Sequence, residues 1–308
     1  MLSDKIRSYN ETEFVDLLMP IIIDDGKSKD EVIKEFISYV RGDETKRVVL
    51  GFDIYRYSSY EPDKQASITM LFNSLYISCI NNLTKNHPLF NSVTRDEFMQ
   101  LFISTGDGGY QILHTPIHAL IVLFNFHNVI VQYHTNPNLR EFRNFLGSIE
   151  LRYVITIEDI YRINHFSYVN HYGKGIIKNA RIMSQDKLNR LLIDEEVYRW
   201  FSDNILGIEN IVSLKWKDLF NIKDFENYSL AEKIKGIEEF SPISTQEDNK
   251  DRQDEFVDCI PMRLEDLKTK DSSYVVYNIY LKTKFYNPNK ETFRYTSIGN
   301  PNSNGLNT

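Results

Sequence analysis

Two aspartates stand where apolar runs of the chain end. Asp53 closes the run Val48–Ile54, and about fifty residues later Asp107 lies in Thr105-Gly106-Asp107-Gly108-Gly109. Aspartates at adjacent strand ends supply the oxygen ligands that two divalent cations need to hold a nucleoside triphosphate. The pair therefore indicates phosphoryl or nucleotidyl transfer. The alternative is ordinary turn chemistry, in which Asp is common.

The segments around the aspartates have an order that predicts the fold. Apolar runs and turn residues predict strands at 46–53, 98–104, 110–114 and 149–157, with helices starting at Pro62 and Pro116 and a glycine-rich hairpin at 105–109. The order strand–helix–strand–strand–helix–strand is the ferredoxin-like pattern. We therefore expect an α+β fold with a ferredoxin-like palm core, in which the strand of Asp53 and the hairpin of Asp107 are neighbours.

The remainder of the chain is assigned more coarsely. Residues 1–45 have apolar side chains at helical spacing and are predicted to be a helical N-terminal extension. The main domain is expected over 46–282, with a mobile, Glu- and Ser-rich surface insertion at about 236–255. The last part, 283–308, is expected to be a polar C-terminal tail. Within the domain, helices are predicted at 173–185 and 194–201, and strands at 191–193, 256–262 and 274–281.

Composition limits the class of protein. The chain has 308 residues, 42% of them hydrophobic, and a formal net charge of −7, which argues against nucleic-acid binding. Cys79 and Cys259 fit no zinc spacing and require no disulfide, so a reducing cytoplasm is the expected location. No signal peptide is evident, and the longest apolar run, 119–131, is too short and too polar to span a membrane.

Three blocks of sequence resemble one family. Phe52-Asp53-Ile54-Tyr55-Arg56-Tyr57-Ser58 is similar to a D-I-x-G-F-S/T motif, and Thr105-Gly106-Asp107-Gly108 to an I-G-D hairpin. Residues 172–183 (YGKGIIKNARIM) are similar to a helix of pattern W-G-x-x-V-N-x-A-x-R-M. In this order and spacing the blocks resemble the class III nucleotidyl cyclases, and the fold of that family is expected here.

The resemblance implies a role for each matched position. Asp53 and Asp107, with the carbonyl of Ile54, would bind two Mg²⁺ or Mn²⁺ ions. The turn that contains Tyr55, Tyr57 and Ser58 would bind the phosphates of a nucleoside triphosphate. Arg181 would stabilise charge on the α-phosphate, and Lys268 or Lys270 would hold the terminal phosphates. Because such sites combine residues of two subunits, the resemblance also implies a homodimer.

Departures from the family pattern bear on the base. Ile103 stands where purine cyclases have a base-reading Lys, and Asn170 where they have a second reader, usually Asp. This resembles the pyrimidine cyclases of the Pycsar antiphage systems, which implies UTP or CTP as substrate, UTP being favoured, and a separate effector that senses the cyclic nucleotide. Ile177 replaces a catalytic Asn, for which Asn179 or Lys174 would have to compensate. An adenylate cyclase and a catalytically silent nucleotide-binding module remain alternatives.

The histidines are given no role in this chemistry. His114 and His118 are spaced to share a helix face, but no third ligand lies near them in the sequence, so a zinc site is not expected. His165 and His171 flank a loop without partners for nucleophilic catalysis. The Arg56 side chain either approaches the phosphates or points to solvent.

Overall fold

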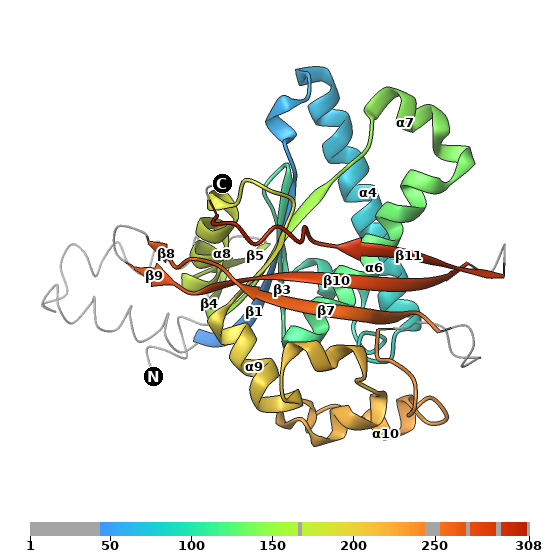
Figure 1. Cartoon of the computed structure of the whole chain (residues 1–308), viewed down its shortest axis with the longest axis vertical. Helices are drawn as coiled ribbons and strands as arrows, with labels where there is room; N and C mark the ends of the chain where they lie inside the picture. Colours follow the sequence, from blue (N-terminus) through green and yellow to red (C-terminus); the bar gives the residue numbers. More distant parts are fainter. Residues whose placement is uncertain (1–43, 166–167, 244–252, 269–271, 288–290, 307–308) are drawn as a thin grey trace, which may run out of the picture.

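The computed structural model describes residues 44–165, 168–243, 253–268, 272–287 and 291–306. The expected N-terminal extension therefore lies outside the described residues, except that Glu44 and Thr45 already belong to the first strand, β1 (Glu44–Ile54). Within these ranges helices pack around one nine-stranded sheet, and two further short strands form a separate pair (Figure 1). None of the helices in the described ranges combines the length and the apolar character needed to cross a bilayer.

The predicted core is present with the predicted strand order. After β1 come α4 (Pro62–Asn86), β2 (Phe102–Ser104), β3 (Gly108–Leu113), α6 (Pro116–Thr135) and β4 (Leu151–His165). These strands lie in the order β4-β1-β3-β2, and each is antiparallel to its neighbours. This is the ferredoxin-like arrangement, so the α+β class is confirmed. Thr115 and Pro116 begin α6 as predicted, the Thr115 side chain accepting a hydrogen bond from the His118 amide.

Alternation along β1 separates two packed layers. Val48, Leu50, Phe52 and Ile54 are buried in the main hydrophobic core, to which α4 and α6 contribute. The alternate residues face α8 (Lys174–Gln185), which lies across the sheet from α4 and α6 (Figure 1). Gly51 allows α8 to approach closely, because a Cβ there would lie 2.1 Å from the Asn179 Oδ1 atom. Asp53 therefore shares its face of the sheet with α8.

Further strands extend the sheet beyond β4. β6 (Leu191–Asp194) pairs parallel to β4, and β10 (Val276–Asn287) pairs with β6. β5 (Tyr168–Tyr172), β7 (Glu255–Arg263) and β11 (Thr292–Ile298) add to β4 or β10. β8 (Leu267–Lys268) and β9 (Ser273–Tyr274) form a separate pair. Helices α5 (Arg95–Met99), α7 (Arg140–Leu146), α9 (Glu195–Ile205) and α10 (Leu230–Lys233) complete the described helical elements together with short 3₁₀ turns.

One predicted strand begins later than the sequence pattern indicates. Residues 95–99 form α5 (Arg95–Met99), and β2 starts at Phe102. The cause is a capping box, in which the Thr94 side chain accepts from the Glu97 amide while the Glu97 carboxylate accepts from the Thr94 amide. This local pair outweighs the strand propensity of the apolar residues that follow.

The polar tail predicted from residue 283 onward is wrong. β10 continues to Asn287, β11 pairs with it from Thr292 to Ile298, and Leu306 is buried. The predicted insertion needs a similar correction in its described part, because the backbones of Glu238 and Phe240 accept hydrogen bonds from the amides of Lys217 and Trp216. Its central residues, 244–252, lie outside the described residues.

Candidate active site

The two aspartates predicted to act together lie side by side. In the β1–β3 ladder Asp53 is opposite Gly108, and the amide of Ile54 donates a 2.9 Å hydrogen bond to the carbonyl of Asp107. The Thr105 hydroxyl donates to the Asp107 carboxylate at 3.2 Å. Burial raises the pKa of the Asp53 carboxyl and the neighbouring Asp107 raises it further, while Arg152 lowers it. The pair thus concentrates negative charge at one end of the sheet.

Gly108 makes this close approach possible. A Cβ at this position would lie 2.1 Å from the Phe52 carbonyl oxygen and 2.9 Å from the Asp53 Cα, both backbone atoms. Gly106 serves the turn differently, since its φ of +94° belongs to the left-handed region that favours glycine. The glycines of the hairpin are therefore part of how the chain delivers Asp107 to Asp53.

Arg152 is a site residue that the sequence did not predict, as are Ser184, Asp186 and Lys187. It lies directly opposite Asp53 in the β1–β4 ladder, and its Nε atom donates to the Asp53 carboxylate. Its Nη1 atom donates to the backbone carbonyl of Asp186 at 2.5 Å. The only sequence signal was a single basic residue near the start of a predicted strand, and its significance depends on the register of β4 against β1.

These groups line a pocket of about 360 Å³. Its walls are formed by the two aspartates, Arg152, the turn after β1 and the segment at the end of α8. The lining residues are Asp53, Ile54, Tyr55, Arg56, Tyr57, Ser58, Asp107, Arg152, Ser184, Asp186 and Lys187. The predicted turn residues Ile54, Tyr55, Tyr57 and Ser58 are thus in place. A 3₁₀ turn, η1 (Tyr57–Ser59), follows Arg56, whose φ of 58° is left-handed.

Two tyrosines hold this turn. The Tyr57 hydroxyl pairs with the Thr69 hydroxyl of α4 at 3.1 Å, and the Tyr55 hydroxyl donates to the carbonyl of Lys187 at 3.1 Å. The guanidinium of Arg56 lies 5.0 Å from the centre of the Tyr55 ring. Arg56 is exposed and lines the pocket, so both orientations left open by the sequence remain compatible with it.

Arg181, Ile103 and Asn170 do not line this pocket. Arg181 lies on α8, where its Nη1 atom donates to the Tyr274 hydroxyl at 3.2 Å. Ile103 packs in the small apolar cluster of Val49, Ile112 and Ile160 on the α8 face of the sheet. The Asn170 amide nitrogen donates to the Tyr172 hydroxyl at 2.8 Å, and its oxygen accepts from the His171 amide. Within one subunit these three residues are thus separate from the aspartate pocket.

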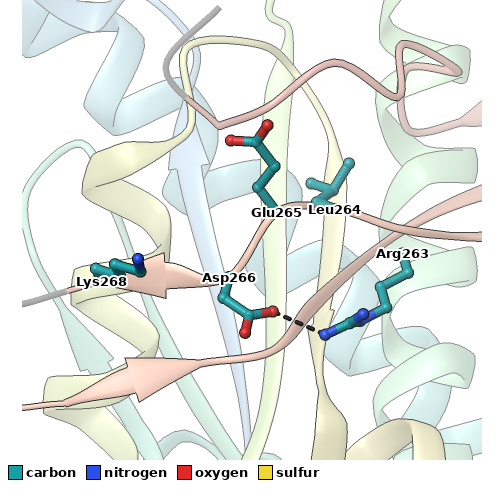
Figure 2. A pocket seen from close by; sticks show the side chains of 5 residues that line it. All are labelled: Arg263, Leu264, Glu265, Asp266 and Lys268. Atoms are coloured by element: carbon teal, nitrogen blue, oxygen red, sulfur yellow. Dashed lines mark hydrogen bonds and ion pairs between the residues drawn. The ribbon is translucent and has the colours of Figure 1, made fainter.

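Lys268, suggested for the terminal phosphates, and Asn179 and Lys174, suggested to replace the missing Asn, do not line this pocket either. Lys268 borders a different pocket, with Arg263, Leu264, Glu265 and Asp266 (Figure 2), and Lys270 is outside the described residues. Asn179 is fully buried and its amide donates to the carbonyls of Val49 and Val154. Asn179 therefore joins α8 to the sheet. Ile177 is 52% exposed, so the buried Asn179 cannot take the place of the Asn that the family has at position 177.

His118 forms part of the core rather than a site. His118 is buried against Phe225 and Phe90, and burial, aided by His114 and His87, lowers its pKa to about 3. Among the described residues no group of three or more His, Cys, Asp or Glu side chains is arranged to hold a metal. Cys79 and Cys259 are both buried and free.

The donor set at the aspartates fits a hard divalent cation. Two carboxylates meet there beside the carbonyl-bearing turn at Ile54, and oxygen ligands are those that Mg²⁺ and Mn²⁺ prefer. The like charge of Asp107 raises the pKa of Asp53, so a cation between the two carboxylates would relieve their repulsion. With two carboxylates, such ions would complete their coordination with water and, when a nucleotide is bound, with its phosphates.

Comparisons with known proteins give a likeness of fold. The sequence matches no protein-family model and no curated protein. Among solved structures it is similar to the guanylyl cyclase Cya2, at 10% identity and a TM-score of 0.41 over 80% of this chain and 95% of that chain. It is also similar to the adenylyl cyclase CyaB from P. aeruginosa, at 12% identity and a TM-score of 0.39 over 77% and 95%.

An adenylate/guanylate cyclase/hydrolase from Silicibacter pomeroyi is similar at 12% identity and a TM-score of 0.42, over 76% of this chain and 96% of that chain. Because identities and TM-scores are this low, the chemistry of the present site has to be inferred from its own residues.

Proposed function

We propose that this protein is a class III-type nucleotidyl cyclase that converts UTP, or CTP, to the 3′,5′-cyclic monophosphate and pyrophosphate. The observation that carries the proposal is the pairing of Asp53 and Asp107 in one pocket beside the turn 54–58. Two Mg²⁺ or Mn²⁺ ions bound to these carboxylates and to the Ile54 carbonyl would favour ionisation of the ribose 3′-hydroxyl and neutralise the phosphates.

The reaction needs positioning and charge stabilisation from the chain. The ribose 3′-oxygen attacks the α-phosphorus and loses its proton, a 3′-oxygen–phosphorus bond forms, and the bond to the bridging oxygen breaks to release pyrophosphate. The turn 54–58 orients the triphosphate, and Arg152 and Lys187 offer cationic groups in the same pocket. Arg181 would stabilise the charge that develops on the α-phosphate.

A homodimer with two equivalent sites is part of this proposal. Arg181 does not line the pocket formed by the aspartates of its own chain, although Ser184 on the same helix does. In the resembling family the metal-binding carboxylates and the catalytic arginine come from different subunits. A second copy of this chain would therefore bring its Arg181 to the pocket of the first.

The pyrimidine preference rests on the two positions where purine cyclases read the base. Ile103 has an apolar side chain and cannot hydrogen-bond to a purine. Asn170 carries an amide, which can turn to match either uracil or cytosine. We infer from the sequence resemblance to Pycsar cyclases that the product acts as a signal in antiphage defence and is sensed by a separate effector.

A product assay tests the proposal directly. The protein is incubated with Mn²⁺ and each of ATP, GTP, CTP and UTP in separate reactions, and products are identified by chromatography and mass. The expected result is cyclic UMP or cyclic CMP, absent with Asp53→Ala and Asp107→Ala. Equal turnover of ATP and UTP would contradict the pyrimidine assignment, and a dominant cyclic AMP peak would assign an adenylate cyclase.

A catalytically silent nucleotide-binding module is the second candidate. Ile177 in place of the family's Asn favours it, as does the ion pair that Arg152 makes with Asp53. Nucleotide that raises the melting temperature only in the presence of Mn²⁺, without any cyclic product, would support the silent module over the enzyme.

A further inference from the structure

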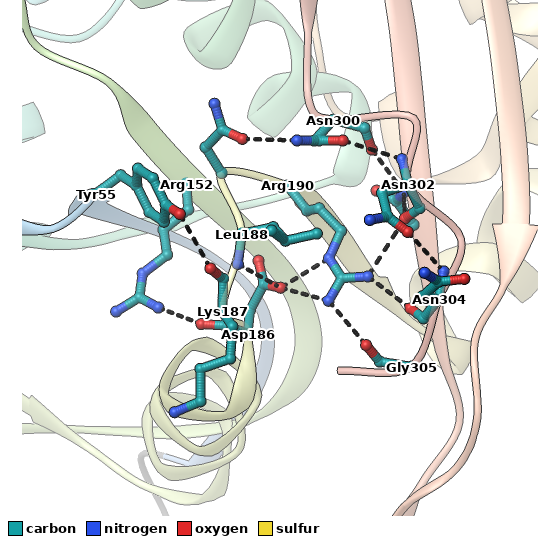
Figure 3. Close-up of polar contacts among 12 residues, drawn as sticks. Tyr55, Arg152, Asp186, Lys187, Leu188, Arg190, Asn300, Asn302, Asn304 and Gly305 are labelled. Carbon is teal, nitrogen blue, oxygen red and sulfur yellow. Dashed lines mark hydrogen bonds and ion pairs between the residues drawn. The ribbon is translucent and has the colours of Figure 1, made fainter. Parts of the chain in front are cut away.

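We propose that Arg190 is a positioning residue for the aspartate pocket, acting with the segment Asn300–Gly305. It fixes the turn at Asp186 and Lys187, and this turn holds Arg152 and Tyr55 in the pocket wall (Figure 3). The inference deepens the proposed function, because the reaction it serves is the nucleotidyl transfer assigned to Asp53 and Asp107.

Arg190 and Asp186 form the buried centre of a polar network. Its side chain has 0% exposure and that of Asp186 1%, and Nε donates to the Asp186 carboxylate at 2.7 Å. Its Nη1 atom donates to the carbonyl of Asn304 at 2.8 Å, and Nη2 to that of Gly305 at 3.4 Å. Because the guanidinium is planar and its N–H groups point in fixed directions, it can bond to all of these partners in only one orientation.

The segment that receives Arg190 is itself anchored. The buried Asn278 of β10 donates to the carbonyls of Asn300 and Asn302 at 2.7 and 3.0 Å. The Asn300 amide donates to the Asn189 side chain at 3.0 Å, and the nearby Leu306 is buried against α8 and β6. The asparagine-rich composition that suggests a tail thus provides backbone acceptors and side-chain bridges for a buried arginine.

Backbone carbonyls of the Asp186–Lys187 turn connect Arg190 to the pocket. The Asp186 carbonyl accepts from Arg152, which also donates to Asp53, and the Lys187 carbonyl accepts from the Tyr55 hydroxyl. Two separate walls of the pocket, β4 and the turn after β1, are therefore tied to consecutive carbonyls. A shift of the Asp186–Lys187 turn would move Arg152 relative to Asp53 and release Tyr55. Arg152 is the residue directly behind the proposed metal ligand Asp53, and loss of such a direct partner lowers metal affinity by about 10–100-fold. Arg190 acts on Asp53 through Asp186 and Arg152.

The test compares Mn²⁺ binding and kinetics in matched variants. Arg190→Lys keeps the buried charge but lacks the planar fork, and Arg190→Gln removes the charge. A chain ending at Ile298 keeps Arg190 and β11 but lacks the segment that accepts its hydrogen bonds. We expect each to bind Mn²⁺, measured by electron paramagnetic resonance without nucleotide, more weakly by up to about tenfold, the lower end of the range for a direct partner of a metal ligand. We also expect a higher KM for the metal–nucleotide, with less change in kcat.

Leu230→Ala is the control for a purely structural effect. Leu230 is buried in α10, outside the pocket and the Arg190 network, so the variant should lower the melting temperature and leave the Mn²⁺ affinity unchanged. If Arg190→Gln does not fold, the Mn²⁺ affinities of Arg190→Lys and of the chain ending at Ile298 test the positioning role. Folded variants with wild-type Mn²⁺ affinity and KM would overturn the positioning role, as would Leu230→Ala weakening Mn²⁺ binding equally.

The outcomes separate this proposal from the cyclase proposal. A wild-type protein that binds Mn²⁺ but forms no cyclic nucleotide contradicts the cyclase alone, and the Mn²⁺ affinities still decide the role of Arg190. A wild-type protein that binds no Mn²⁺ overturns both.

Discussion

The amide of Ile54 donates a hydrogen bond of 2.9 Å to the carbonyl of Asp107. This bond joins the residue after the first aspartate to the second aspartate itself, at the point where β1 ends and the β2–β3 hairpin turns. Separation of the two aspartate backbones therefore requires breaking the end of the β1–β3 ladder. The sheet thus holds the two residues next to each other, which suits a site that must keep two like charges close together.

Asp107→Asn should abolish metal-dependent activity. The substitution preserves the size of the side chain and its contact with Thr105, but removes one of two anionic ligands. We expect cyclic nucleotide formation to fall by about a hundredfold or more, which corresponds to the loss of a few kcal/mol of stabilisation. Mn²⁺ should also cease to raise the melting temperature of the variant, as read by thermal denaturation with and without EDTA.

Asp63→Asn serves as the matched control, because Asp63 is an exposed carboxylate in the first turn of α4. It should retain both activity and the Mn²⁺-dependent stabilisation. If Asp107→Asn kept wild-type turnover, the assignment of the aspartates as metal ligands would be wrong.

Gly108→Ala should impair the site more than Gly106→Ala. The added methyl group at position 108 would meet the backbone of Phe52 and Asp53, which has to move, whereas a methyl group at 106 meets no atom within 4 Å. Gly106→Ala should cost only the strain of its positive φ, about 1–2 kcal/mol. Chemical denaturation and Mn²⁺ titration of both variants measure the difference. Equal losses of Mn²⁺ affinity would contradict the close-approach role of Gly108.

Mixtures of two inactive variants should regain activity if the sites are shared between subunits. Asp107→Asn lacks the carboxylate side of each site, and Arg181→Ala lacks the arginine side. Each mixed dimer has one intact site out of two, so mixed dimers purified through both tags should have about half of wild-type activity. Recovery is measured after the variants are co-expressed with different tags and purified through both. Absence of recovery in purified mixed dimers would place Arg181 in the site of its own chain.

The buried histidines should make the fold less stable in acid. Burial lowers the pKa of His118 to about 3 and those of His87 and His127 to about 4, against about 6.5 when unfolded. The unfolded chain therefore binds more protons at pH 4–6.5. Stability is complete above about pH 6.5 and falls as the pH drops, approaching about 1.4 kcal/mol per pH unit for each histidine.

His118→Phe isolates one of these contributions. The variant keeps an aromatic ring against Phe225 and removes the titrating group and its unpartnered, buried Nε2 atom. Urea unfolding at pH 7.5, 6.0 and 5.0 should give a shallower loss of stability than in the wild type. Parallel curves for the two proteins would mean that His118 does not remain neutral in the fold.

The sequence predicted the features whose cause is local. The apolar run through Val48–Ile54, the glycines around Asp107 and the proline-started helices predicted the core elements and the meeting of the two aspartates. The helix of Arg181 was also predicted, because its pattern extends over several turns. Where a short-range interaction competed, as in the capping box of Thr94 and Glu97, the strand prediction failed by several residues.

Only the tertiary structure decided which distant residues complete the pocket. Arg152 faces Asp53 because of the β1–β4 register, and a shift of one residue would turn its side chain to the other face of the sheet. Arg190 and the segment Asn300–Gly305 meet across more than a hundred residues of chain, and their polar composition by itself predicts exposure. Hydrophobic periodicity marks which side of an element is buried, but the pairing of strands determines which polar groups are buried together, and that pairing is a property of the whole sheet.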